Sequence, residues 1–213
     1  MGVWVVLLLA LFGDIGAADV HVLDVPYRSQ LDGSGYALAN CGPASLSMAL
    51  AFYGIDASPW DLRVKSMKAQ HSWVGDDGGY SDRYGVFVYN LASAAETTDV
   101  HASGLWTREG GRVDRLHEWQ PTEIRREVQA DHPVIVQVGY RALPKHAGST
   151  TLDDHFIVIH GLRGTDFVYS DPLGVGDAGP AETISETDLV GAMGRSSAPR
   201  VGFAVVGARG RPS

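Results

Sequence analysis

A single cysteine, Cys41, is the feature that most restricts how this chain can fold. The chain has 213 residues and one cysteine, so neither an intrachain disulfide nor a multi-cysteine metal site can hold it together. The fold must therefore depend on a buried apolar core. With 45% hydrophobic and 20% charged residues, the chain is long enough to form one globular domain with such a core.

The N-terminus carries a short apolar run from residue 3 to residue 12. The run is too short to span a bilayer comfortably, and Gly16, Ala17 and Ala18 follow it at the spacing that a signal peptidase reads. We therefore expect residues 1–18 to be a cleaved secretory signal, and the mature protein to be extracytoplasmic (secreted or periplasmic) without stable membrane insertion. A retained anchor and a start codon assigned too early are the alternatives.

The charge of the chain restricts its partners. The formal net charge is -8 at pH 7 and the pI is about 5.4. An acidic surface argues against nucleic acid or an anionic membrane as the main partner. Basic residues are scattered, except in a short tail, residues 208–213, which we expect to be disordered.

The order of the predicted elements indicates an α+β domain over residues 19–207. We expect a short strand at 22–25, helices at 41–53, 59–69, 86–95 and 121–130, and strands at 134–140, 156–160, 166–170 and 201–206. Residues 70–119 are the least periodic part of the chain. The helix at 41–53 should pack against a C-terminal antiparallel sheet.

Cys41 is expected at the first turn of that helix, followed by Gly42 and Pro43. Proline is favoured in a first turn because its missing N–H is not needed there. A helix N-terminus offers free N–H groups and a partial positive charge, which favour a thiolate. A lone cysteine is usually a small buried apolar residue, but this position suits a nucleophile.

A histidine and an aspartate lie far downstream, on two strands that should form a hairpin. If the turn is centred on Arg163, His155 lies directly opposite Asp171, and opposed residues point to the same face of a sheet. The carboxylate could then orient the imidazole as a base for Cys41. His160 should face the other side of the strand.

Gln30 precedes Cys41 by one loop. Its side-chain amide could donate one hydrogen bond to a developing oxyanion, and the backbone N–H of Cys41 could donate a second.

Taken together, these segments resemble the C39-like cysteine peptidases, a group within the papain-like superfamily that is related to the bacteriocin-processing domains of peptide exporters. The resemblance rests on Asp24-Val25-Pro26-Tyr27 with Ser29-Gln30, Asn40-Cys41-Gly42-Pro43-Ala44-Ser45, Asp154-His155-Phe156-Ile157-Val158, and Tyr169-Ser170-Asp171-Pro172. It covers residues 22–206 and implies a papain-like fold. No exporter domain follows these segments, which puts a dedicated leader-peptide role in doubt.

The resemblance also implies the roles of the site residues. Cys41 would be the nucleophile, His155 the base, Asp171 the residue that orients it, and Gln30 the oxyanion donor. The implied activity is hydrolysis of peptide or protein substrates through a thioester acyl-enzyme, without a cofactor. An acyl transferase similar to phytochelatin synthase and a non-catalytic binding module on the same fold are the alternatives.

Other candidate sites carry weaker signals. The segment 76–82 is acidic but lacks the alternation and final glutamate of an EF-hand, and we expect a solvated turn. The histidines show no zinc-binding spacing, so no metal site is expected. The glycine-rich segment 174–179 is expected to be a loop. The oligomeric state is left open.

Overall fold

The computed structural model describes residues 19–69, 85–109, 112–150, 153–174 and 179–208. The expected signal segment, the acidic segment 76–82, most of the C-terminal tail and part of the glycine-rich loop lie outside these residues. Within the described residues, no helix is long and apolar enough to cross a membrane.

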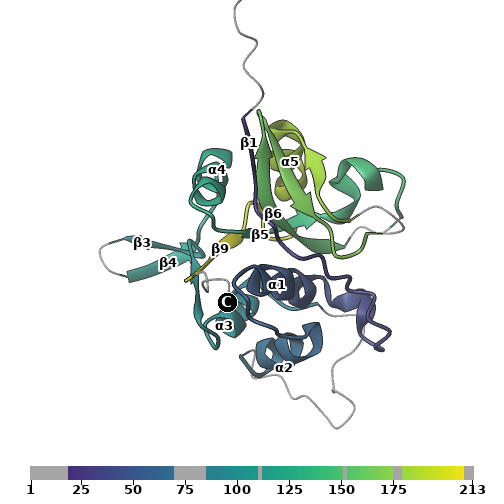
Figure 1. Cartoon of the computed structure of the whole chain (residues 1–213), viewed down its shortest axis with the longest axis vertical. Helices are drawn as coiled ribbons and strands as arrows, with labels where there is room; N and C mark the ends of the chain where they lie inside the picture. Colours follow the sequence, from purple (N-terminus) through teal and green to yellow (C-terminus); the bar gives the residue numbers. More distant parts are fainter. Residues whose placement is uncertain (1–18, 70–84, 110–111, 151–152, 175–178, 209–213) are drawn as a thin grey trace, which may run out of the picture.

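Most described strands form one antiparallel sheet of seven (Figure 1). Its path runs β2 (Val100–Ser103), β9 (Gly202–Gly207), β5 (Val134–Gly139), β6 (Asp154–Arg163), β7 (Asp166–Ser170) and β8 (Glu182–Ile184), while β1 (Val20–Val22) pairs with β6. A separate hairpin is formed by β3 (Trp106–Glu109) and β4 (Arg112–Leu116). The expected α+β class is confirmed.

Helices cover both faces of the sheet (Figure 1). On one side lie α1 (Cys41–Phe52), α2 (Pro59–Ala69) and α3 (Val88–Ala95), and on the other α4 (Pro121–Gln129) and α5 (Glu186–Gly194). Short 3-10 turns are η1 (Ala37–Ala39), η2 (Tyr140–Ala142) and η3 (Pro144–His146). Five predicted strands and four predicted helices are present within a few residues of their expected bounds, whereas β2, β3, β4, β8 and α5 were not predicted.

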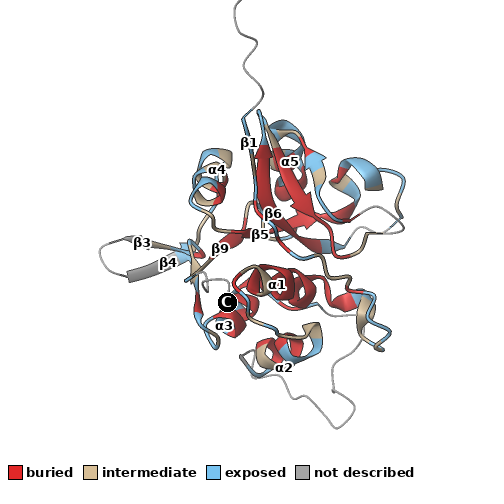
Figure 2. Ribbon diagram, in the orientation of Figure 1, coloured by how far each residue is buried: buried red, intermediate tan, exposed pale blue. Residues whose placement is uncertain are grey.

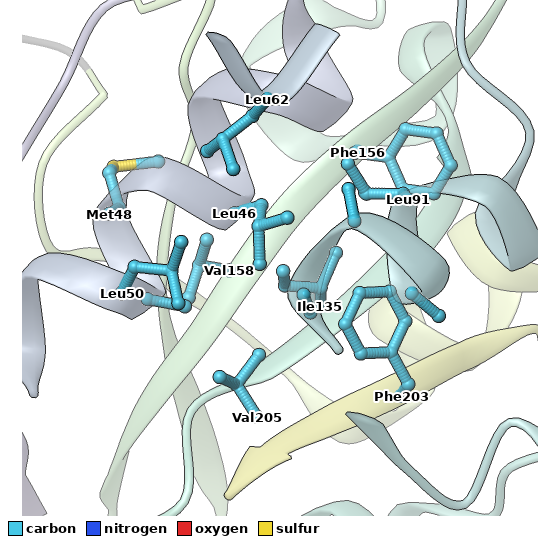
Figure 3. Close-up of a cluster of buried hydrophobic side chains, with 14 of the residues drawn as sticks. Leu46, Met48, Leu50, Leu62, Leu91, Ile135, Phe156, Val158, Phe203 and Val205 are labelled. Carbon is cyan, nitrogen blue, oxygen red and sulfur yellow. The ribbon is translucent and has the colours of Figure 1, made fainter. Parts of the chain in front are cut away.

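The core has two layers, one on each face of the sheet, because both faces of the central strands are buried. In β5, Ile135 packs toward α1, while Val134, Val136 and Val138 pack toward α4 and α5. This follows from the alternation of side chains along a strand. Figure 3 shows the layer on the α1 side, where side chains from α1, α2, α3 and the sheet meet: Leu46, Met48, Leu50, Leu62, Leu91, Ile135, Phe156, Val158, Phe203 and Val205.

Helix α1 is the central element of that layer. Every residue from Cys41 to Leu50 is buried (Figure 2). A helix that is apolar on all sides is expected in a protein interior, between other elements. The sheet supports α1 on one side and α2 and α3 contact it on the other, so its first residue has a fixed position.

Candidate active site

Cys41 is the first residue of α1, as predicted, and the helix start is left without a side-chain cap. The preceding residue, Asn40, makes no capping hydrogen bond. Its side chain instead donates to Asp32 Oδ2 (3.3 Å) and accepts from Arg63 Nη1 (3.4 Å). Because Pro43 has no N–H, the first-turn donors are those of Cys41 and Gly42, and both lie at the positive end of the helix.

The predicted base and its orienting carboxylate are in contact. His155 Nε2 lies 2.6 Å from Asp171 Oδ1, and their side chains are 4% and 2% exposed. His155 comes near the start of β6, and Asp171 directly follows the end of β7.

The register that led to this pair was wrong by two residues. Val158 pairs with Ser170 and Ile159 with Tyr169, so an extension of this ladder would place Ile157, not His155, opposite Asp171. The hairpin turn is centred between Gly164 and Thr165, and the register shifts at His160. A shift of two residues keeps a side chain on the same face, which is why the two side chains still meet.

The side chain of Cys41 also interacts with His155. Because Nε2 is taken by Asp171, Nδ1 is the ring nitrogen that remains for Cys41. Burial alone would lower the pKa of His155, but the hydrogen bonds to Asp171 and Cys41, together with their negative charges, raise it to about 9. The imidazole is therefore held in its protonated form at neutral pH.

Asp171 is ionised although it is buried. Burial would raise its pKa, but hydrogen bonds from His146, His155 and the backbone N–H of Leu173 hold the pKa of this carboxyl well below its usual range. An ionised carboxylate can only accept hydrogen bonds. His155 must therefore carry a proton on Nε2, which fixes its tautomer.

Gln30 lies between the Asp171 turn and the start of α1. Its backbone N–H donates to Pro172 O (2.8 Å), and its side-chain Nε2 donates to Ala37 O (2.9 Å), four residues before Cys41. The side chain is buried, and Oε1 has no partner among the described residues. One hydrogen of the amide nitrogen is used by Ala37, so one remains for another acceptor.

His160 has a structural role, because both of its ring nitrogens contact other parts of the chain. Its Nδ1 lies 3.1 Å from Leu23 O and its Nε2 lies 3.0 Å from Ser170 Oγ. Burial lowers its pKa, which suits a neutral ring that links the N-terminal segment to the sheet.

A cleft of about 400 Å³ lies beside Cys41. Its walls are mostly apolar and come from the segment before α3, from α3 and from β4 and β6: Val86, Phe87, Val88, Tyr89, Leu116 and Phe156. Polar groups at its edge are Gln137, Asp153, Asp154 and Ser197. In the part of the chain that the structure describes, no cluster of three or more His, Cys, Asp or Glu side chains could hold a metal ion.

Comparisons with known proteins show the family and the fold of this chain. Residues 22–190 match the family model of the Peptidase_C39 like family. The chain belongs to this family. It is therefore a cysteine-type peptidase, as predicted, although a search of curated protein sequences gave no match.

Solved structures show the same fold as this C39-like peptidase. A protein from Bacillus anthracis described as a C39-like peptidase aligns with a TM-score of 0.59 at 16% identity, covering 90% of this chain and 100% of the other. The peptidase domain of Streptococcus ComA, a bifunctional ABC transporter of a quorum-sensing pathway, aligns with a TM-score of 0.55 at 16% identity, covering 86% and 100%. At such identities the likeness concerns the fold.

A third similar structure contains a peptide. It is a double glycine motif protease from an AMS/PCAT transporter in complex with the leader peptide, with a TM-score of 0.51 and 20% identity, and it covers 88% of this chain and 94% of the other.

Sequence reasoning missed one residue of this C39-like peptidase that contacts the proposed site. His146, in η3, lies 2.8 Å from Asp171 Oδ2 through its Nε2. It sits in a short irregular segment, 25 residues from Asp171 along the chain. No periodicity or motif spacing in the sequence connects the two.

Proposed function

We propose that this C39-like peptidase hydrolyses peptide bonds with Cys41 as nucleophile, His155 as acid and base, and Asp171 as the residue that orients His155. The observation that carries the proposal is the hydrogen bond between His155 and Asp171, with Cys41 acting on the same imidazole and lying in the wall of a cleft. A nucleophile, its base and an orienting group in this order are what acyl transfer requires.

The chemistry follows from the proton positions. The thiolate of Cys41 attacks the peptide carbonyl carbon, and the carbonyl electrons move onto oxygen. The imidazolium of His155 then donates its Nδ1 proton to the departing amine, which leaves a thioester on Cys41. The neutral imidazole next takes a proton from water, and the resulting hydroxide attacks the thioester carbonyl and releases the acid.

We place the oxyanion between the Cys41 backbone N–H and the free amide hydrogen of Gln30. The uncapped helix start supplies the first donor, and the hydrogen bond to Ala37 O fixes the direction of the second group. Preorganised donors of this kind stabilise the charge that develops on the carbonyl oxygen.

A peptide substrate suits the cleft. The similar transporter protease is in complex with a leader peptide, and the walls beside Cys41 are apolar. Phe87, Tyr89 and Trp106 are 58%, 40% and 40% exposed. The first two rings stack 5.6 Å apart, and Trp106 lies 6.5 Å from Tyr89. Exposed aromatic groups next to a cleft mark a binding surface, so we propose that substrates carry apolar side chains near the cleaved bond.

The test is incubation of the protein with a diverse peptide library in water enriched in oxygen-18, with mass spectrometry of the products. Hydrolysis should give new C-termini that contain the heavy oxygen, with apolar residues enriched at the cleaved bond. Cys41→Ala should give no products while keeping the melting temperature of the wild type. Products without the heavy oxygen, joined to an added amine or thiol, would instead indicate an acyl transferase.

We also propose that the protein acts outside the cytoplasm after residues 1–18 are removed. Cleavage after Ala18 would leave β1, which begins at Val20, intact in the sheet. Sequencing the N-terminus of protein recovered from its natural host tests this, and a start at Met1 or Gly2 would contradict it.

A further inference from the structure

The carboxylate of Asp171 is held between two histidines. His155 Nε2 lies 2.6 Å from Oδ1 and His146 Nε2 lies 2.8 Å from Oδ2. The backbone N–H of Leu173 also donates to Oδ1, at 2.8 Å. The proposed reaction accounts for His155 and leaves the role of His146 open.

Both histidines must donate to this carboxylate. Asp171 is 2% exposed and ionised, and an ionised carboxylate has no proton to give. His146 therefore carries a proton on Nε2. With a donor on each oxygen, the carboxylate plane cannot rotate without breaking a charge-assisted hydrogen bond, which is a strong one.

His146 is itself held in place. Its ring stacks on Tyr140 at 4.2 Å with an interplanar angle of 21°, and the edge of the same tyrosine meets His155 at 5.0 Å and 76°. The neighbouring residue, Lys145, forms an ion pair with Glu182 of β8. The His146 side chain is 16% exposed, so η3 presents it to Asp171 from a packed position.

We propose that His146 is a positioning residue, which fixes the Asp171 carboxylate in the orientation that keeps His155 aligned with Cys41. This proposal rests on the proposed function for its kinetic consequences, but the alignment itself can be measured without turnover. If Oδ2 loses its donor, the carboxylate can turn away from His155. The imidazolium then loses part of its support.

Several other titratable groups face this carboxylate, and they belong to different elements. Burial raises the pKa values of three tyrosines, from the N-terminal segment, η2 and β7, and the charge of Asp171 raises them further: Tyr27, Tyr140 and Tyr169. The charge of Glu182 also raises the pKa of Tyr169, and Cys41 raises the pKa of His155. None of these groups donates to Oδ2 within the described residues, so the loss of His146 should leave that oxygen without a protein partner.

The experiment compares two substitutions that separate the hydrogen bond from the stacked ring. His146→Phe keeps an aromatic ring against Tyr140 but removes the donor. His146→Gln removes the ring but carries an amide nitrogen near the position of Nε2. Two rates are followed against pH: turnover of a peptide found in the library, and alkylation of Cys41 by iodoacetamide, which needs the Cys41 thiolate but no substrate.

We expect His146→Phe to lower kcat by roughly 10- to 100-fold, the equivalent of one hydrogen bond to a charged group. The alkaline limb of turnover should move to lower pH, because a poorly held Asp171 supports the His155 imidazolium less. The acidic limb of alkylation should move to higher pH, because a less stable imidazolium favours the Cys41 thiolate less. His146→Gln should recover most of the rate and both wild-type limbs. In an Asp171→Asn background, His146→Phe should have almost no further effect, because it acts through that carboxylate.

Other outcomes overturn the proposal. A purely structural His146 would lower the melting temperature in both variants and leave both limbs in place. An alkaline limb of turnover that moves to higher pH in His146→Phe would show that His146 only competes with His155 for the carboxylate charge. A His146→Gln variant that behaves like His146→Phe would assign the effect to the ring.

The readouts also separate this proposal from the proposed function. If no peptide is cleaved but the alkylation profile shifts as described, peptidase activity on those peptides is refuted and the positioning role stands. If His146→Phe unfolds, the alkylation comparison is made with His146→Leu, which also lacks a donor. An unchanged alkylation profile in that variant would refute the positioning role.

Discussion

At the scale of single residues, the amide of Gln30 illustrates how much depends on the direction of one group. Its nitrogen donates to Ala37 O and its backbone is tied to Pro172. These contacts fix the direction of the amide, which is almost completely buried. Such fixed orientation is what distinguishes a preorganised donor from a solvated side chain.

We expect Gln30→Ala to slow turnover by roughly 10²–10³-fold. The loss should fall on kcat and leave KM almost unchanged, because the donor interacts mainly with charge that develops in the transition state. Steady-state kinetics on a cleaved peptide measure both constants. A matched control is Gln120→Ala, an amide that caps α4. A change in KM alone, or no change in either constant, would contradict a role of Gln30 in the oxyanion site.

The sequence could single out Cys41, His155, Asp171 and Gln30 as candidates because each lies in a local pattern that can be read without the fold. Cys41 opens a predicted helix, and the His–Asp pair needs only the alternation of a hairpin. That argument tolerated a register error of two residues, whereas an error of one would have put the two side chains on opposite faces. His146 gave no such local signal, because its contact with Asp171 depends on how η3 folds back over the sheet.

At the scale of elements, most long segments were predictable and most short ones were not, with the helix α5 and the short strand β1 as exceptions. The residues of α1 and β7 match their expected ranges closely, since helix α1 has a first-turn proline and β7 is a compact apolar run. The strands β2, β3 and β8 have three or four residues each. Pairing with a neighbouring strand, not a local pattern, makes them strands.

Strand β6 gives a prediction at this scale, because β1 and β7 both pair with it at Gly161. A Cβ there would lie 2.9 Å from Val22 Cγ2, 3.0 Å from Val168 Cβ and 3.1 Å from Val22 Cα. We expect Gly161→Ala to lower the free energy of unfolding by about 1–3 kcal/mol, through overpacking. Urea denaturation measures the change.

Gly191 supplies the matched control. It lies exposed in α5, and a Cβ there would meet nothing within 4 Å. Gly191→Ala should raise the free energy of unfolding by about 0.5–1 kcal/mol, because alanine favours a helix more than glycine does. A Gly161→Ala variant as stable as the wild type would show that β1 can move away from β6 at little cost.

At the scale of the whole molecule, the buried His155–Asp171 pair links stability to pH. The pKa of His155 is raised from 6.5 to about 9 on folding. Its contribution is therefore fully present below about pH 6.5 and is lost as the pH rises through about 9. Asp171 has a lowered pKa, so its contribution is present above its ordinary pKa near 4 and is lost as the pH falls further.

We expect the free energy of unfolding to fall by up to about 3 kcal/mol between pH 6 and pH 9.5. Urea denaturation across this range measures the fall. His155→Gln should remove most of this slope, because a neutral amide gains no proton. A wild-type protein that is equally stable at both ends of the range would contradict the raised pKa of His155.

The large separation in sequence between Cys41 and β6 has a consequence for the protein while it is still folding. The proposed nucleophile comes from the helical N-terminal half, while its base and carboxylate belong to strands more than a hundred residues later in the chain. The central strand β5 completes its pairing only when β9 joins it. Contacts this distant form late in folding. A chain that is still being synthesised therefore has a thiol but no base beside it, and the proposed triad is assembled only in the finished domain.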